Sequence, residues 1–154
     1  MIVTSAVMIW NCMKLTLWTE SPVVVVLSGS MEPSMQRGDV LLLAKNTPIV
    51  NGDIIVYELP GEGIPIVHRV VTWQKDDKGK IKLLTKGDNN PVNDRGLYKN
   101  KELYITDDMV VGKVHGIVPY AGYLTIMLND YPMLKFAMLG TMLLSVLLTK
   151  DPNA

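Results

Sequence analysis

Apolar residues are concentrated at the two ends of the chain, and short apolar runs alternate with polar turns between them. Residues 1–18 have Asn11 and Lys14 as their strong polar interruptions, and their length approaches the roughly 20 apolar residues that cross a bilayer. This stretch predicts an N-terminal transmembrane helix. A buried amphipathic helix is an alternative, and a cleavable signal peptide fits less well because no basic residue precedes the run. We expect Cys12, which lies within it, to be buried and inert.

The second apolar stretch covers residues 133–150 and is interrupted by Lys135. It is shorter than a comfortable membrane span, so three structures remain open: a short membrane helix, a helix lying at the membrane interface and a core helix. The two ends divide the chain into an N-terminal transmembrane helix, a central domain, and a short apolar C-terminal helix with a tail, at residues 1–19, 20–129 and 130–154.

The central residues have the pattern of an all-β domain. Short β-branched or apolar runs are separated by turn residues, such as the Arg-Gly-Asp and Asn-Gly-Asp sequences that each open a run. These runs predict strands at residues 23–27, 40–44, 54–59, 64–73, 80–85 and 109–114. Their succession favours a mainly β fold, a meander or a small, partly open β-barrel, over a fold in which strands and helices alternate.

Composition narrows the function mainly by exclusion. The chain has 154 residues with 15 basic and 15 acidic side chains, so its net charge is zero and nothing indicates a nucleic-acid partner. It contains two histidines and one cysteine, without HExxH or CxxC spacing, and it lacks a Gly-rich phosphate loop. We therefore expect neither a metal site nor a cofactor, and the candidate chemistry falls on hydroxyl, imidazole and carboxylate groups.

Ser30 follows the predicted strand 23–27 by way of Ser28 and Gly29. A serine delivered by a strand can act as a nucleophile if a base accepts its proton and a third group orients that base. Ser-Gly-Ser after a strand is more often an ordinary turn, however. The nucleophile elbow of α/β-hydrolases is disfavoured because Glu32 occupies the position where that motif has glycine.

His68 is the candidate base. By period-two alternation it shares an apolar strand face with Ile64, Ile66 and Val70. Burial disfavours the imidazolium cation, so a histidine there stays neutral near pH 7 and can accept a proton. A hydrogen-bonded core histidine has the same pattern. His115, the other histidine, lies beside a turn with no carboxylate nearby in the sequence.

The polar stretch 84–98 supplies carboxylates for the second nitrogen of such a base. It contains Asp88 and Asp94 among asparagines, glycines and a proline, a composition that is also typical of a solvated loop. A lysine could replace the histidine as base, but Lys45 and Lys86 both adjoin turns, where the desolvation that a neutral lysine needs is hard to arrange. The residue types therefore favour a serine, histidine and aspartate set by elimination.

Three segments, in this order, resemble a known family: SGSMEPSMQRGDVLLL, GDIIVYELPGEGIPIVHRVV and LLTKGDNNPVNDRGLY. They are similar to the type I signal peptidases, and most of all to the catalytic subunits of the eukaryotic endoplasmic-reticulum type. The resemblance extends over nearly the whole chain. It implies a membrane-bound serine endopeptidase, a hydrolase that removes signal peptides from secretory and membrane preproteins at small-x-small sites.

The resemblance also assigns roles to residues of this chain. It implies that Ser30 is the nucleophile, His68 the general base, Asp94 the third member and Asp88 a second important acid. It further implies an oxyanion hole formed by Ser28 and Ser30. Bacterial members carry a lysine where this chain has His68, so the histidine indicates the endoplasmic-reticulum subtype.

The same resemblance implies partners and a location. The expected partners are the signal peptides of preproteins, the other subunits of a signal peptidase complex and the lipid bilayer. The expected location is the endoplasmic-reticulum membrane, with a single pass and the catalytic domain in the lumen. One alternative is a catalytically inactive scaffold subunit of the same complex. A self-cleaving, repressor-type serine protease fits less well, because of the apolar ends and the absence of a DNA-binding domain.

Overall fold

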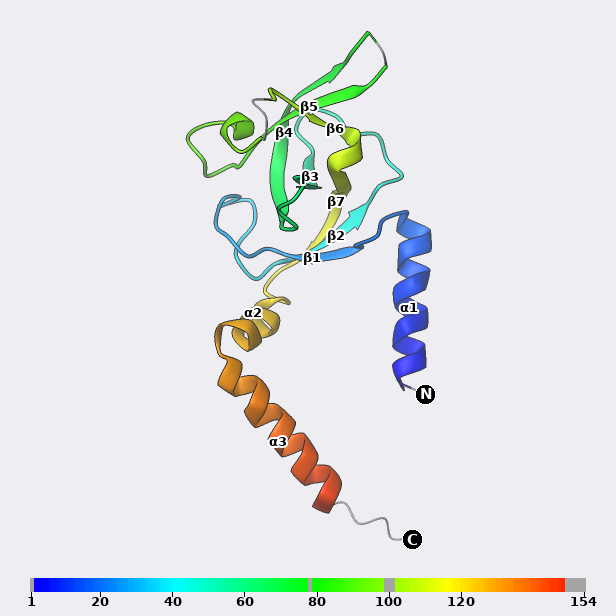
Figure 1. Cartoon of the computed structure of the whole chain (residues 1–154), viewed down its shortest axis with the longest axis vertical. Helices are drawn as coiled ribbons and strands as arrows, with labels where there is room; N and C mark the ends of the chain where they lie inside the picture. Colours follow the sequence, from blue (N-terminus) through cyan, green and yellow to red (C-terminus); the bar gives the residue numbers. More distant parts are fainter. Residues whose placement is uncertain (1, 78, 99–101, 149–154) are drawn as a thin grey trace.

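The computed structural model of the chain describes residues 2–77, 79–98 and 102–148 (Figure 1). The helices are α1 Ile2–Leu17, α2 Tyr123–Asp130 and α3 Pro132–Leu148, with 3-10 helices η1 Asp94–Gly96 and η3 Asp107–Met109. The strands are β1 Val23–Val25, β2 Val40–Ala44, β3 Ile54–Glu58, β4 Pro65–Lys75, β5 Ile81–Lys86, β6 Ile105–Thr106 and β7 Val110–Val118. Residue 1 and the tail after residue 148, which the sequence assigns to the two end regions, lie outside the described residues.

The mainly β central domain expected from the sequence is confirmed. Strand β2 has the predicted bounds, and the other predicted runs each overlap a strand. The pattern does not predict β6, because two residues are too few to show alternation. It also fails in the stretch 84–98, where the first residues belong to β5 and Asp94 and Tyr98 are buried. The interpretation of that stretch as a solvated loop is therefore wrong for these residues.

The described strands form one seven-stranded antiparallel sheet in the order β1-β2-β7-β3-β4-β5-β6. The sheet is not a simple meander, because β7 comes last in the chain and yet lies between β2 and β3. Strand β4 pairs with β3 through Pro65–Arg69 and with β5 from Arg69 onward. As a result, the segment from Pro65 to His68 has β3 on one side and no strand among the described residues on the other.

Two groups of buried side chains form the core. One gathers around the sheet's β3, β4 and β5, with Tyr57 and Leu83 fully buried. The other lies beneath the segment that joins β1 to β2, and includes Met31 and Met35 at 0% and 1% exposure. Burial of an apolar side chain of this size stabilises a fold by about 1.5–3 kcal/mol. Because Met31 is the neighbour of Ser30, its burial anchors the turn that carries the candidate nucleophile.

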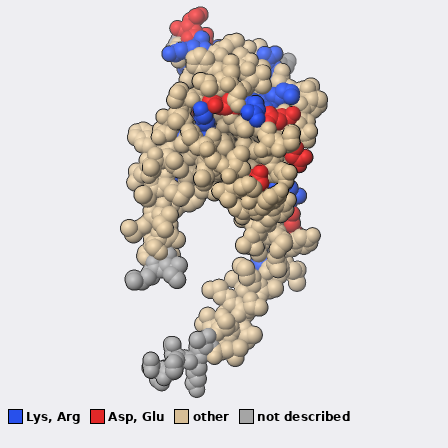
Figure 2. All heavy atoms as spheres, turned by 180° about the vertical axis from the view of Figure 1, so that it is seen from behind, with Lys and Arg blue, Asp and Glu red and all other residues tan. Residues whose placement is uncertain are grey.

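Helices α1 and α3 project from the same side of the sheet (Figure 1). On the face shown in Figure 2, charged side chains gather over the sheet, and the two helical arms are almost entirely uncharged. Apolar side chains along both arms are exposed, Met8 on α1 and Phe136 on α3 among them. In the described part of the chain, no helix combines the length and the apolar character required to traverse a membrane.

Two expectations about the ends are corrected by this arrangement. Cys12 is exposed on α1 and is not buried, because α1 projects from the sheet instead of packing against it. The C-terminal stretch is not a core helix, because the described side chains of α3 are exposed along its length.

Candidate active site

Ser30 lies in a closed loop between β1 and β2. The loop is closed by two backbone hydrogen bonds, from the Val26 amide to the Asp39 carbonyl at 2.9 Å and from the Gly38 amide to the Val26 carbonyl at 2.8 Å. The buried Asp39 carboxylate accepts a further bond from the Gln36 amide at 2.9 Å. These bonds fix the ends of the loop, and the buried Met31 fixes its middle, so Ser30 is held on a defined turn.

The segment after β5 packs directly against this turn. The Asn89 amide donates to the Ser30 carbonyl at 2.9 Å, and the Asn89 side-chain amide donates to the Gly29 carbonyl at 3.1 Å. A Cβ atom at Gly87 would lie 2.7 Å from the Ser30 carbonyl oxygen, which is too close for any side chain. Glycine at position 87 therefore permits the close approach of the two loops.

The fold brings three of the candidate residues into one hydrogen-bonded series. His68 Nε2 lies 3.2 Å from Ser30 Oγ, and His68 Nδ1 lies 2.5 Å from Asp94 Oδ2. His68 and Asp94 are 4% and 2% exposed. An ionised carboxylate can only accept, so Nδ1 carries the proton and Nε2 is left as an acceptor facing the serine hydroxyl. This is the arrangement that a nucleophile, a general base and an orienting acid require.

Ser28 joins this group from the solvent side. Its Oγ lies 3.3 Å from Ser30 Oγ, and its side chain is exposed. A hydroxyl at that distance can donate to an oxygen that develops beside the nucleophile. The role of Ser28 in an oxyanion hole stays a prediction.

Asp94 is surrounded by buried hydroxyl groups that the sequence pattern does not predict. Thr85 Oγ1 donates to Asp94 Oδ2 at 2.6 Å and the Tyr57 hydroxyl donates to the same oxygen at 3.2 Å. The Tyr98 hydroxyl lies 2.9 Å from Thr85 Oγ1. The three residues are on β3, on β5 and just after η1, so no local motif connects them. Period-two alternation does place Tyr57 and Thr85 inward, but it cannot show what they face.

The charge states of this cluster follow from burial and hydrogen bonding. Burial opposes ionisation of Asp94, but hydrogen bonds from His68 and Thr85 and the positive charge of His68 outweigh it and hold the pKa below its ordinary value. Burial raises the pKa of Tyr57 and of Tyr98. Asp94 is therefore an acceptor at neutral pH, and both phenols keep their protons and can donate.

The second acid, Asp88, is held by Arg69 and does not contact His68. Arg69 Nε donates to Asp88 Oδ1 at 2.9 Å and Arg69 Nη2 donates to Asp88 Oδ2 at 2.7 Å. Ser34 Oγ donates to Asp88 Oδ2 at 2.5 Å. The Arg69 hydrogen bonds hold the pKa of Asp88 below its ordinary value. Because Arg69 follows His68 on β4, this pair ties the strand of the base to the segment after β5 and, through Ser34, to the loop that carries Ser30.

We expect the Asp88→Asn variant to be less stable than wild type at neutral pH, by about 1 kcal/mol. The folded-state pKa of Asp88 lies below its ordinary 3.8. The stabilisation is therefore complete above about pH 5 and is lost as the pH falls through the folded-state pKa. Thermal unfolding of both proteins across this pH range measures the difference. Asp107→Asn, at an exposed position, is the control, and a difference that stays constant into strong acid would contradict the explanation.

The alternative bases lie elsewhere. His115 Nδ1 donates to the Lys113 carbonyl at 3.1 Å, and His115 Nε2 lies 3.2 Å from Thr47 Oγ1. Lys45 is exposed and Lys86 is half-buried. Within the described residues none of these three side chains contacts Ser30, so the geometry favours His68 as its partner.

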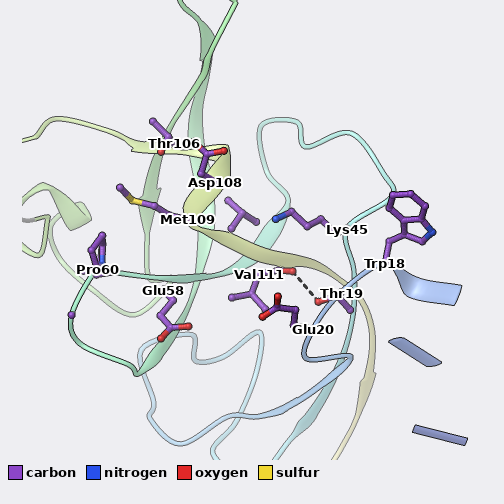
Figure 3. A pocket seen from close by; sticks show the side chains of 13 residues that line it. Trp18, Thr19, Glu20, Lys45, Glu58, Pro60, Thr106, Asp108, Met109 and Val111 are labelled. Carbon is purple, nitrogen blue, oxygen red and sulfur yellow. Dashed lines mark hydrogen bonds between the residues drawn. The ribbon is translucent and has the colours of Figure 1, made fainter. Parts of the chain in front are cut away.

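A cavity of about 740 Å³ lies away from this cluster, where the chain leaves α1 (Figure 3). Thr19 Oγ1 donates to the Val111 carbonyl at 2.9 Å on its wall. Glu20, Glu58 and Lys45 also line it. Neither this cavity nor any other part of the described chain contains a group of three or more histidine, cysteine or acidic side chains placed to hold a metal ion.

The chain is similar to known families and to known proteins along most of its length. Residues 11–114 match the family described as Peptidase S24-like, and residues 123–148 match the signal peptidase C-terminal short helix. The chain is 50% identical over 153 residues to the signal peptidase complex catalytic subunit SEC11C of Homo sapiens, covering 98% of this chain and 80% of the relative. It is 46% identical over 157 residues to SEC11 of Komagataella phaffii, covering 98% and 92%. It is 45% identical over 144 residues to SEC11 of Plasmodium falciparum, covering 94% of this chain and 78% of the relative.

The S24-like match includes every segment that carries the serine, histidine and aspartate cluster, and it defines a serine peptidase. Sequence identity of 45 to 50% over nearly the full chain identifies a narrower family within this class of peptidases. On that evidence the chain belongs to the family of signal peptidase complex catalytic subunits.

Proposed function

We propose that this chain cleaves signal peptides from preproteins, with Ser30 as nucleophile, His68 as general base and Asp94 as the acid that orients the base. The observation that carries the proposal is the series from Ser30 Oγ through the His68 ring to Asp94, at 3.2 Å and 2.5 Å. The chain acts with the other subunits of a signal peptidase complex, as the names of its relatives suggest.

The chemistry follows from these positions. His68 Nε2 takes the Ser30 hydroxyl proton as Oγ attacks the carbonyl carbon at the cleavage site. Asp94 stabilises the imidazolium that forms, and the Ser30 amide with the Ser28 hydroxyl donates to the developing oxyanion. His68 then gives its proton to the leaving amine, and water, activated by the same histidine, releases the acyl group from Ser30.

The free edge of β4 supports a mode of substrate binding. The segment from Pro65 to His68 has unpaired backbone groups on the side away from β3, within the described residues. An extended peptide can add to such an edge as a further strand, so that alternate side chains face the enzyme. This places the peptide backbone beside His68. Shallow pockets along it would select the small residues of a small-x-small site.

The helical arms support an association with lipid. Apolar side chains of α1 and α3 are exposed, for example Leu15 at 76% and Met133 at 77%. We propose that both arms contact the bilayer of the endoplasmic reticulum and hold the sheet on its luminal side. The single membrane pass of residues 1–19 stays a prediction from the sequence, as does the division at residues 19 and 129. That division assigns nearly all of α2 to the central domain.

The test of the function is preprotein processing in membranes reconstituted from the chain and its companion subunits. The expected product is a mature protein whose N-terminus, determined by mass spectrometry, follows a small-x-small sequence. Intact preprotein would contradict the proposal and favour the inactive scaffold.

Ser28→Ala is expected to lower kcat by about 10²-fold and leave KM nearly unchanged, because an oxyanion-hole donor acts mainly in the transition state. The measurement is the kinetics of preprotein cleavage in the same membranes. Ser21→Ala is the matched control, since Ser21 precedes β1 and lies outside the cluster. Equal rates for Ser28→Ala and Ser21→Ala would remove Ser28 from the oxyanion hole.

A further inference from the structure

One carboxylate oxygen at the centre of the site accepts from three donors. Asp94 Oδ2 is bonded by His68 Nδ1, by Thr85 Oγ1 and by the Tyr57 hydroxyl, at 2.5 Å, 2.6 Å and 3.2 Å. Thr85 and Tyr57 are both 0% exposed. Water does not supply these bonds at such burial, so the direction in which each hydroxyl points is set by the protein.

The protons in this cluster can be assigned one by one. Ionised Asp94 is an acceptor only, so the single hydroxyl proton of Thr85 points to it. The lone pairs of Thr85 Oγ1 are then free to accept from the Tyr98 hydroxyl, which lies 2.9 Å away. The Tyr98 oxygen in turn accepts from the Thr85 backbone amide at 3.0 Å. The result is a continuous series of hydrogen bonds from the Thr85 backbone amide on β5, through the Tyr98 and Thr85 hydroxyls, to Asp94.

We propose that Thr85, oriented by Tyr98, is a positioning residue of the peptidase reaction that keeps Asp94 ionised and aligned with His68. Thr85 does not touch the reacting atoms and acts through Asp94. The inference deepens the proposed function and rests on the assignment of Ser30 and His68.

This series of hydrogen bonds lowers the proton affinity of the Asp94 carboxylate. A carboxylate that accepts a hydrogen bond from a hydroxyl has its charge partly neutralised by the donor. It is therefore less basic towards the imidazole and towards solvent protons. Without the Thr85 hydroxyl, Asp94 would take up a proton more readily, and its more concentrated charge would also bind the imidazolium form of His68 more tightly. Both changes move the acid limb of the pH–rate profile to higher pH.

The titratable groups around Asp94 come from each element packed against it. They are His68 on β4, Tyr57 on β3, Tyr98 after η1, and Arg95 within η1. Tyr57 and Tyr98 keep their protons throughout the range in which peptidase activity is measured, because burial raises the pKa of both. Neither phenol therefore contributes to a shift of the profile in this range.

The test compares Thr85→Val, Thr85→Ser and wild type in reconstituted membranes. Valine keeps the branched shape on β5 and removes the hydroxyl, whereas serine keeps the hydroxyl. We expect Thr85→Val to lower kcat about 10-fold to 100-fold with little change in KM, and to shift the acid limb upward. Thr85→Ser is expected to restore the wild-type profile. Thr72→Val on the neighbouring β4 is the matched control, because within the described residues the Thr72 side chain makes no hydrogen bond.

A second measurement does not depend on activity. The chain has two histidines, and His68 is buried while His115 is exposed, so the His68 Nδ1 proton is expected to give its own downfield NMR signal. Without the Thr85 donor, Asp94 Oδ2 is a stronger acceptor for Nδ1, so this signal should lie further downfield in Thr85→Val than in wild type. If Thr85→Val does not fold, Tyr98→Phe, which removes the donor to Thr85, is expected to move the same signal in the same direction by less.

The outcomes separate the two hypotheses. An unchanged acid limb and an unchanged Nδ1 proton signal in Thr85→Val would overturn the role of Thr85. A loss of rate with an unchanged profile would also overturn it, since that is the result of a purely structural role. Failure of the wild type to process preprotein would overturn the proposed function. The Nδ1 proton signal would still decide whether Thr85 controls the His68–Asp94 pair.

Discussion

Ser30→Ala is expected to abolish preprotein cleavage, with kcat lower by about 10⁴- to 10⁶-fold. Alanine keeps the backbone of the turn and removes the only oxygen that lies 3.2 Å from His68 Nε2 among the described residues. No acyl-enzyme can then form. Because the half-buried Ser30 side chain bonds only to His68 and Ser28 within the described residues, the free energy of unfolding of the variant is expected to lie within about 1 kcal/mol of the wild-type value.

The measurement is single-turnover cleavage of a preprotein in reconstituted membranes, with thermal unfolding as the folding control. Ser21→Ala, the same substitution outside the cluster, should cleave at the wild-type rate. Undiminished cleavage by Ser30→Ala would show that another residue is the nucleophile and would overturn the mechanism.

Asp94→Asn is expected to lower kcat by about 10⁴-fold, close to the loss on removing the nucleophile. Asparagine has nearly the same shape but no charge. If its oxygen takes the place of Oδ2, the His68 imidazolium forms without a neighbouring anion. If its amide nitrogen does so, His68 Nδ1 must accept, and Nε2 then carries a proton and cannot take one from Ser30. Either orientation removes the function of the base.

The comparison that decides between the two acids is Asp94→Asn against Asp88→Asn, measured as kcat for the same preprotein. Asp88 is bonded to Arg69 and Ser34, and Asp94 to His68. A smaller loss of rate is therefore expected for Asp88→Asn. Equal losses would show that the link from Asp88 to the strand of the base matters as much as the direct bond. Asp107→Asn again provides the control for loss of a carboxylate.

Much of the strand pattern and the inward face of β4 could be predicted locally. His68 was placed with Ile66 and Val70 by alternation, and the structure has His68 and Val70 buried. Alternation works here because successive side chains of a strand point to opposite faces whatever the strand pairs with. The same reasoning could not find the place of β7, since pairing of β2 with β7 joins segments some 70 residues apart.

Composition was misleading where tertiary contacts override local polarity. The stretch around Asp94 has the residues of a solvated loop, yet Asp94 is 2% exposed. It can be buried because His68, Thr85 and Tyr57 satisfy its charge, and without such donors burial of a carboxylate costs several kcal/mol. Cys12 is the opposite case. Its sequence neighbours are apolar, yet it is exposed because α1 does not pack on the sheet.

By itself, the sequence determined the strands, the apolar ends and the residue types of the site, because hydrophobic period, turn residues and motif order are properties of neighbouring positions. The tertiary structure decided which acid serves the histidine and which hydroxyls hold that acid. Asp88 and Asp94 lie in one polar stretch of the sequence, but Asp88 is bonded to Arg69 and Asp94 to His68. The reason is that adjacent residues of β4 face opposite sides of the sheet, and only the folded sheet brings each aspartate to one of them.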